Sequence, residues 1–415
     1  MNYRVLLMGF VLFMTAASAQ TNKLNAALDE LTARLIANKE VAGINVLVIK
    51  DNKTLYNKAT GYADVERRKP LATTDIFRIA SQTKAITSVA VMMLWEEGRF
   101  LLDEPVSKYI PAFKAPRVID TFNPSDSSYT TIAANREITI RDLLRHTSGI
   151  TYPFFSTDPR FNAIYSKAEV PTWIGSEGGS LKEKIGLLAR QPLVHQPGKA
   201  FTYGLNTDVL GYLVEVVSGM PLDVFFQTRI FKPLGMDDTY FKIPQHKAQR
   251  LVPVVEINTS GISRITHPIY EGNSVDYPTK EGVLLSGGAG LSSTTADYAK
   301  FLQLLLNRGM YNGKRLIGKK TLELMTTNQL GQEAMANGDA GFRFGLGFSL
   351  ITQDNQYLHS ENSGSFYWGG AFNTHYWVDP EANLIGLVFT QQYLPSSYWD
   401  LGTLFKNVIY ASLND

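Results

Sequence analysis

Apolar residues recur with a helical period near the N-terminus and with a strand-like period at both ends of the chain. Residues 23–41 place leucines at positions 24, 28, 31 and 35, the spacing of one helix face. Residues 43–64 then form two β-branched runs around the polar turn Asp51-Asn52-Lys53, which predicts a β-hairpin. Strand-like runs return at 344–352, 373–379 and 383–392, and the amphipathic segment 398–413 predicts a closing helix.

The central part of the chain has a different pattern. Residues from about 100 to 280 are helical in patches and punctuated by prolines. Strands at both ends with helices between them predict an α/β (α+β) fold, in which one antiparallel sheet is assembled from the two termini and carries a mostly helical lobe. No internal repeat or low-complexity linker divides residues 20–415, so we expect one catalytic domain with two lobes.

The first nineteen residues have the pattern of a secretory signal peptide. Arg4 precedes an apolar run from Val5 to Met14, and the small residues Ala17-Ser18-Ala19 form an A-x-A cleavage pattern. The apolar run is too short for a stable membrane anchor, although an uncleaved N-terminal anchor is the alternative. We therefore expect cleavage after Ala19 and a periplasmic or secreted protein.

Composition narrows the partners and the chemistry. The 415 residues are 44% hydrophobic and carry 40 Lys and Arg against 38 Asp and Glu, a difference of 40 − 38 = +2 without long runs of one sign, so nucleic acid is not an expected partner. The absence of cysteine excludes disulfides, thiolate metal sites and a cysteine nucleophile. The sequence gives no indication of the oligomeric state.

Several catalytic motifs are missing. No G-x-S-x-G, H-E-x-x-H, P-loop or Gly-rich dinucleotide fingerprint occurs, and the six histidines are scattered. We therefore expect neither a metal nor a cofactor, and we interpret each histidine as a surface residue or a structural one.

One helix opens with a candidate nucleophile. In residues 77–98, "FRIASQTKAITSVAVMMLWEEG", Ser81 and Lys84 lie three positions apart and so share a helix face. The simpler interpretation is a serine N-cap with an exposed lysine. The alternative is a nucleophile and its activator, because an apolar helix follows Lys84, and burial lets a lysine accept a proton.

The wider sequence around this motif resembles the serine β-lactamase-like superfamily, which includes class C β-lactamases, D,D-peptidases and family VIII carboxylesterases. The resemblance begins at "DIFRIASQTKAITSVAVMMLWEEGRFLLDEPVSKYIPAF" and continues, in the family's order, through "ITIRDLLRHTSGI", "PLVHQPGKAFTYGLNTDVLGYLVEVVSG", "PLGMDDTYF", "GGAGLSSTTADYAKFLQLLLN" and "GSFYWGGAFNTHYWVDPE".

The resemblance implies roles for individual residues. Ser81 takes the place of the acylated nucleophile, Lys84 that of its activating partner, and Tyr203 that of the catalytic tyrosine. A tyrosine beside an ammonium can accept the serine proton and return it to the leaving group. Trp368, Gly369 and Gly370 stand where the family usually has a Lys-Thr-Gly-like triplet, and the N–H groups of Ala371 and Ser81 would form the oxyanion hole.

Two departures from the family pattern bear on the substrate. Leu205 stands at the position of the asparagine that binds the β-lactam side chain, and Asn206, one residue later, is the candidate replacement. Trp368 replaces the lysine that helps to hold a substrate carboxylate, which favours an apolar acyl or alcohol group. The Trp-Gly-Gly triplet is similar to family VIII carboxylesterases.

Three functions remain open at this point. The first is a serine esterase that forms an acyl-enzyme on short-chain or uncharged esters. The second is a β-lactamase, D,D-carboxypeptidase or D-amino-acid amidase. For both of these functions the expected partner is a small-molecule ester or amide substrate. The third is a non-catalytic peptidoglycan-binding or scaffold protein. The loop-rich segments 114–136 and 153–190 are candidate walls or lids of the substrate pocket.

Overall fold

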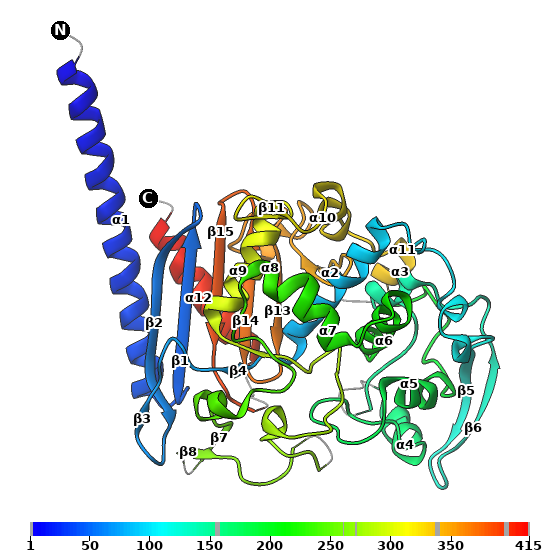
Figure 1. Ribbon diagram of the computed structural model, residues 1–415. Coiled ribbons are helices and arrows are strands. Elements are labelled where there is room, and N and C mark those ends of the chain that lie inside the picture. The colour runs from blue at the N-terminus through cyan, green and yellow to red at the C-terminus, as the bar shows by residue number, and fades with distance from the viewer. Residues whose placement is uncertain are drawn as a thin grey trace.

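A seven-stranded antiparallel sheet joins the two ends of the chain (Figure 1). The computed structural model describes residues 3–153, 158–259, 261–269, 272–336, 341–393 and 398–413. In spatial order, the strands of the sheet are β12 (Ser349–Leu350), β13 (Phe366–Gly370), β14 (Thr374–Asp379), β15 (Leu384–Phe389), β1 (Gly43–Lys50), β2 (Lys53–Asp64) and β3 (Lys69–Pro70). The C-terminal strand β15 pairs directly with β1, from Asn45 opposite Phe389 to Lys50 opposite Leu384, so the sheet is built from both termini, as predicted.

The predicted hairpin consists of β1 and β2. Asp51 and Asn52 connect the two strands and have φ values of 52° and 58°. Positive φ at both central residues is what a two-residue hairpin turn of the type I′ class requires, and Asp and Asn tolerate it well. The polar turn read from the sequence therefore sets the register of this edge of the sheet.

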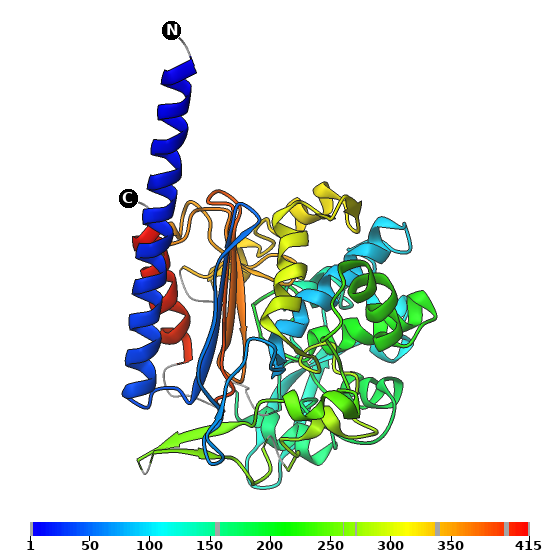
Figure 2. The same cartoon turned by 60° about the vertical axis from the view of Figure 1, so that its left-hand side comes forward.

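Helices cover both faces of the sheet (Figure 2). The terminal helices α1 (Tyr3–Ala37) and α12 (Tyr398–Leu413) lie together on one face. The four leucines that predicted the N-terminal helix are buried against this face, in a cluster with Trp377. The helices α2 (Thr83–Glu96) and α9 (Thr295–Leu306) cover the other face, where the helical lobe begins.

The helical lobe contains short helices and small β-hairpins. Its helices are α3 (Ile140–Leu144), α4 (Arg160–Lys167), α5 (Leu181–Ala189), α6 (Asn206–Ser218), α7 (Leu222–Phe226) and α8 (Lys232–Leu234), and α10 (Lys319–Met325) and α11 (Gln332–Ala336) follow α9. The small two-stranded sheets are β5 (Arg117–Asn123) with β6 (Ser128–Ala133), β7 (Val255–Asn258) with β8 (Gly261–Arg264), β4 (Phe77–Arg78) with β9 (Ser292–Ser293), and β10 (Met310–Tyr311) with β11 (Lys314–Arg315).

Three local predictions were wrong. The segment 114–136, interpreted as loop, contains the β5–β6 hairpin, whose β6 residues are mostly exposed, so no apolar alternation marks that strand. Within the predicted strand 344–352 only β12 is a strand. The helix predicted over 77–98 begins at Thr83, because residues 77–78 pair with β9 and residues 80–82 form a tighter 3₁₀ turn, η1 (Ala80–Gln82).

Of the helices that the structure describes, none is long and apolar enough by itself to cross a bilayer. The segments Asn206–Ser218 and Leu222–Leu234 reach that length and apolar character only when they are taken together, and they are bent by 79° relative to each other.

Candidate active site

Ser81 lies in the turn η1, between strand β4 and helix α2. The residue before it, Ala80, has φ = 40°, which a residue with a Cβ adopts only at an energetic cost. Strained backbone of this kind is concentrated at functional sites, where the surrounding fold holds it in place. Here the surroundings are tight, because a Cβ added to Gly370 of β13 would lie 2.1 Å from the carbonyl oxygen of Ile79. Strand β13 therefore needs glycine to reach the nucleophile turn.

Lys84 is buried beside Ser81, with 2% of its surface exposed. Its Nζ donates hydrogen bonds to Ser81 Oγ at 3.3 Å, to the Tyr152 hydroxyl at 2.9 Å and to the Gly288 carbonyl at 2.8 Å. An ammonium has three donors, so this geometry gives each of them a partner. The interpretation of Lys84 as an exposed charge on a capped helix is therefore wrong.

Tyr203 faces the same ammonium. Lys84 Nζ lies 4.8 Å from the centre of the Tyr203 ring, and the indole N–H of Trp368 donates to the Tyr203 hydroxyl at 3.3 Å. Tyr203 precedes α6, while Trp368 belongs to β13. The structure thus brings together Ser81, Lys84 and Tyr203 from segments far apart in the sequence, as the resemblance implied, and it places Trp368 against them.

The loop 146–152 supplies a second tyrosine that the sequence analysis did not identify. Tyr152 contacts Lys84, and its ring lies 5.3 Å from that of Tyr203. The close approach depends on Gly204, since a Cβ there would lie 2.2 Å from the carbonyl oxygen of Ile150. The block "ITIRDLLRHTSGI", which carries part of the family resemblance, ends two residues before Tyr152. The sequence therefore placed Tyr152 next to a family motif, but no pattern in the sequence indicated that its hydroxyl contacts Lys84.

Asn206, the expected replacement for the family asparagine, has its side-chain amide engaged inside the protein. It is fully buried, its Oδ1 accepts from Ser148 Oγ at 2.5 Å, and its Nδ2 donates to His146 Nδ1 at 3.0 Å and to the Ile150 carbonyl at 3.3 Å. Leu205 is equally buried. The assignment of Asn206 as a substrate-binding residue is therefore corrected: its amide fastens the loop 146–150 to the start of α6.

His146 stays uncharged in this environment. Burial lowers its pKa well below the ordinary value, and the charge of Lys84 lowers it further. Its Nδ1 accepts from the Asn206 amide and, at 3.4 Å, from the Gly204 N–H. The imidazole therefore acts as a buried acceptor that shapes the loop, in agreement with the interpretation of the histidines as structural.

A buried carboxylate lies behind the lysine. Asp208 of α6 accepts at Oδ1 from Ser286 Oγ at 2.5 Å and from the Gly288 N–H at 3.1 Å, and the carbonyl of the same Gly288 accepts from Lys84. Burial raises the pKa of Asp208 above its ordinary value, and the Lys84 charge and the two hydrogen bonds offset this only in part. A Cβ at position 288 would lie 2.5 Å from Asp208 Oδ2. Asp208 and Gly288 thus orient the acceptor that Lys84 uses.

The two glycines and Ala371 follow the predicted placement at the end of β13. Gly369 and Gly370 are buried and pair with His375 and Thr374 of β14. Ala371 packs in the same cluster as Ala80, which precedes the nucleophile. The strand end and the turn η1 are therefore neighbours, the arrangement that an oxyanion hole from the N–H groups of Ser81 and Ala371 would need.

Aromatic rings form a continuous wall that starts at the catalytic candidates. The ring of Tyr203 lies 5.4 Å from that of Trp368, and Trp368 lies 5.5 Å from Phe344. Phe201 continues the wall at 5.1 Å from Phe344, and Phe342 lies 4.7 Å from Phe201. Trp368, Phe201 and Phe342 are only half-buried. The wall thus offers apolar surface beside Tyr203.

For metals, the described part of the chain contains no group of three or more His, Cys, Asp or Glu side chains able to hold an ion.

Comparisons with known proteins identify the family of the chain. The Beta-lactamase family matches residues 28–405. Esterase EstB of Burkholderia gladioli is 27% identical over 415 residues, covering 96% of this chain and 98% of that protein. Lovastatin esterase of Penicillium rubens is 30% identical over 383 residues, 86% of this chain and 90% of its own. Among solved structures, EstCE1, a hydrolase with promiscuous acyltransferase activity, superposes with a TM-score of 0.81 at 24% identity over 94% of this chain and 99% of its own.

The family match spans most of the chain, and the fold is that of the solved relatives. Because the relatives include esterases, we do not retain the third function, a non-catalytic peptidoglycan-binding or scaffold protein. The chain belongs to the β-lactamase family and is a serine hydrolase.

Proposed function

We propose that the protein is a carboxylesterase that acts on uncharged esters through an acyl-enzyme on Ser81. The observation that carries this proposal is Trp368, which stands against Tyr203 where β-lactamases and D,D-peptidases have a lysine for the substrate carboxylate. The aromatic wall that continues from Trp368 offers apolar contacts and no positive charge of its own. The names of EstB and lovastatin esterase support the same activity.

The proposed reaction has two halves. One group of the Lys84–Tyr203 pair must be deprotonated for the reaction to begin. Ser81 Oγ attacks the ester carbonyl while its proton passes to this deprotonated group, and the N–H groups of Ser81 and Ala371 stabilise the oxyanion. The pair then gives this proton to the departing alcohol, which leaves an acyl group on Ser81. In the second half, water attacks the acyl carbon and gives its proton to the same pair. The pair returns that proton to Ser81 Oγ as the carboxylic acid leaves, which restores the enzyme.

Acyl transfer to an alcohol is a second candidate. The aromatic wall would hold an apolar alcohol near the acyl-enzyme as readily as an apolar acyl group, so that an alcohol could replace water as acceptor. The description of EstCE1 as a hydrolase with acyltransferase activity supports this candidate. Addition of an alcohol to the ester assay separates the two, because transfer yields a new ester instead of the free acid.

The test of the esterase proposal compares kcat/KM for p-nitrophenyl butyrate and nitrocefin in the wild type and in Trp368→Lys. We expect efficient ester turnover, little nitrocefin cleavage, and a relative gain for nitrocefin in the variant of about 10- to 100-fold, since a charge-assisted contact contributes about 1.5–3 kcal/mol. Trp368→Phe is the matched control, because it keeps a ring and adds no charge. Fast nitrocefin cleavage by the wild type would instead establish a β-lactamase.

We also propose that the protein is exported to the periplasm or the medium. The apolar run and the A-x-A pattern before Gln20 support this proposal. N-terminal sequencing of protein made in a bacterial host tests it: a mature start at Gln20 agrees with cleavage, whereas an intact Met1 in the membrane fraction would indicate an uncleaved anchor.

A further inference from the structure

Arg78, three residues before the nucleophile, is a fully buried cation that makes no hydrogen bond to a described carboxylate. Its Nε donates to the Val275 carbonyl at 2.8 Å, and its Nη1 donates to the Val252 carbonyl at 2.7 Å and to Gln391 Oε1 at 3.1 Å. All three acceptors are neutral. The nearest carboxylate is Asp276, 3.9 Å from Nη2, too far for a hydrogen bond.

The N–H pair on Nη2 is therefore not used within the described part of the chain. Burial lowers the pKa of Arg78 to about 10, and electrostatic interactions with Tyr277 and Asp276 offset that effect only in part. An arginine that is desolvated and incompletely compensated is a costly arrangement for a purely structural residue.

A second arginine borders the same cavity as the first. Arg264, at the end of β8, and Arg78 both line one cavity, so their guanidinium groups border a shared space. The nearest carboxylate to Arg264 is Asp64, at 4.0 Å, and among the described residues its guanidinium makes no hydrogen bond. Two guanidinium groups that line one cavity and have unused donors can bind an oxyanion, because each offers a planar pair of N–H groups.

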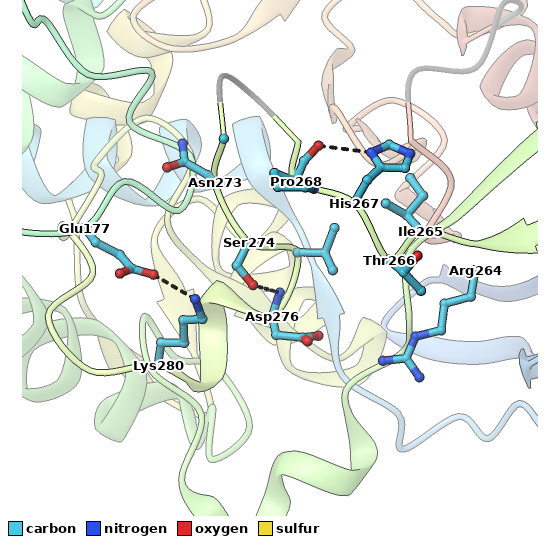
Figure 3. Close-up of a pocket in the computed structure, with 12 residues that line it drawn as sticks. Glu177, Arg264, Ile265, Thr266, His267, Pro268, Asn273, Ser274, Asp276 and Lys280 are labelled. Atoms are coloured by element: carbon cyan, nitrogen blue, oxygen red, sulfur yellow. Dashed lines mark hydrogen bonds and ion pairs between the residues drawn. The ribbon is translucent and has the colours of Figure 1, made fainter.

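Both arginines line one cavity of about 480 Å³. Arg67 and Lys69 also line it, and its carboxylates are Asp64 and Asp276, so the lining holds 4 − 2 = +2 charges. Arg264 and Asp276 also border the neighbouring cavity of about 570 Å³ that Figure 3 shows. In that view Lys280 is paired with Glu177 on the side away from Arg264, so the charge of Lys280 is already compensated there.

We propose that this cavity is a binding site for a small oxyanion of the phosphate class, held between Arg78 and Arg264. The ligand would accept hydrogen bonds from Nη2 of Arg78 and from the guanidinium of Arg264, and Arg67 and Lys69 would add long-range attraction. The site is separate from Ser81 and does not depend on the proposed esterase function. The source of the phosphoryl group is free phosphate or a lipid headgroup, which share this chemistry.

Binding there would reach the nucleophile turn through the core. Ile265, Val275 and Tyr277 come from the segment that Arg78 fastens, and they pack in one buried cluster with Ala80 and Phe372. An anion that neutralises the two arginines removes their repulsion, so we expect it to stabilise this wall of the fold and to raise the melting temperature.

The test measures binding of inorganic phosphate by calorimetry and by thermal unfolding, against sodium chloride of equal ionic strength. We expect saturable binding to the wild type and a loss of affinity of about tenfold or more in Arg264→Gln, with partial retention in Arg264→Lys. Arg308→Gln is the matched control, because Arg308 borders a different cavity on α10 and should leave binding unchanged.

Two results would overturn the proposal. One is the absence of a phosphate effect beyond that of chloride, and the other is phosphate binding that Arg264→Gln leaves intact while the variant remains folded. The source is tested separately with vesicles: Arg264-dependent binding to phosphatidic acid but not to phosphatidylcholine indicates a headgroup ligand, and binding of phosphate alone indicates a soluble one. Arg264 is partly exposed and makes no hydrogen bond to a described residue, so its replacement should not prevent folding.

Discussion

The ammonium of Lys84 lies closer to the hydroxyl of Tyr152 than to that of Ser81, at 2.9 Å against 3.3 Å. Two tyrosines thus surround the lysine: Tyr152 accepts its hydrogen bond, while Tyr203 presents its ring to it and takes a hydrogen bond from Trp368. The two phenols should therefore differ in their effect on catalysis, the first by holding Lys84 and the second by moving the serine proton.

Replacement of each tyrosine by phenylalanine separates these roles. Tyr203→Phe should reduce kcat/KM for p-nitrophenyl butyrate by about 10²- to 10⁴-fold, the range of a lost general acid–base group. Tyr152→Phe should reduce it by about tenfold, since it removes one neutral hydrogen bond to Lys84. Steady-state kinetics measure both, with Tyr212→Phe on α6 as control. A larger loss in Tyr152→Phe than in Tyr203→Phe would reverse the assignment.

Asp208 should tune the pH dependence of the reaction. Asp208→Asn keeps an oxygen for Ser286 and Gly288 but removes the negative charge behind Lys84. Positive charge at Lys84 is then less favourable, so we expect the whole pH–rate profile to move to lower pH. Of the other groups that surround Lys84, His146 is neutral and Tyr152 and Tyr203 are phenols, so none compensates for the lost charge. An unchanged profile in Asp208→Asn, equal to that of the exposed control Asp223→Asn, would contradict this role.

Acid should loosen the loop that carries Tyr152. Burial would raise the pKa of Asp142 in α3, but hydrogen bonds from Arg136, Thr139 and Arg145 outweigh it and hold the pKa at about 2, below the ordinary 3.8. Because the folded value is the lower one, the stabilisation is fully present above about pH 4 and is lost as the pH falls from about 4 to 2; it amounts to about 2 kcal/mol.

Urea unfolding of the wild type and of Asp142→Asn at several pH values measures this contribution. The variant should be less stable at pH 7, and the difference should shrink between pH 4 and pH 2. A difference that is constant over this range would show that the carboxylate charge is not responsible.

The sheet and its topology were predictable because strong local patterns mark the strands that form it. The strands β1, β14 and β15 are almost wholly buried, and Asp51-Asn52 fixes a two-residue turn between β1 and the more exposed β2. The β5–β6 hairpin escaped prediction since most of its residues face solvent on both sides, which leaves no alternation to read.

The candidate site was predictable only in part, and for a physical reason. Ser81 and Lys84 share one helix turn, so spacing alone could pair them, whereas Tyr203 and Trp368 reach them through tertiary packing that only the resemblance to a family could indicate. Tyr152 and Asp208 depend on close backbone approaches at Gly204 and Gly288. Asn206 was misassigned because its amide could bind a substrate amide. In the structure the side chain is buried and binds the loop 146–150 instead, and this burial could not be predicted from the sequence.

The central claim, covalent catalysis by Ser81, is tested most directly by intact-protein mass spectrometry after reaction with a fluorophosphonate and with p-nitrophenyl butyrate. We predict a single adduct that peptide mapping places on Ser81, together with loss of both the adduct and ester turnover in Ser81→Ala. An adduct on another residue, or ester turnover that survives in Ser81→Ala, would contradict the account.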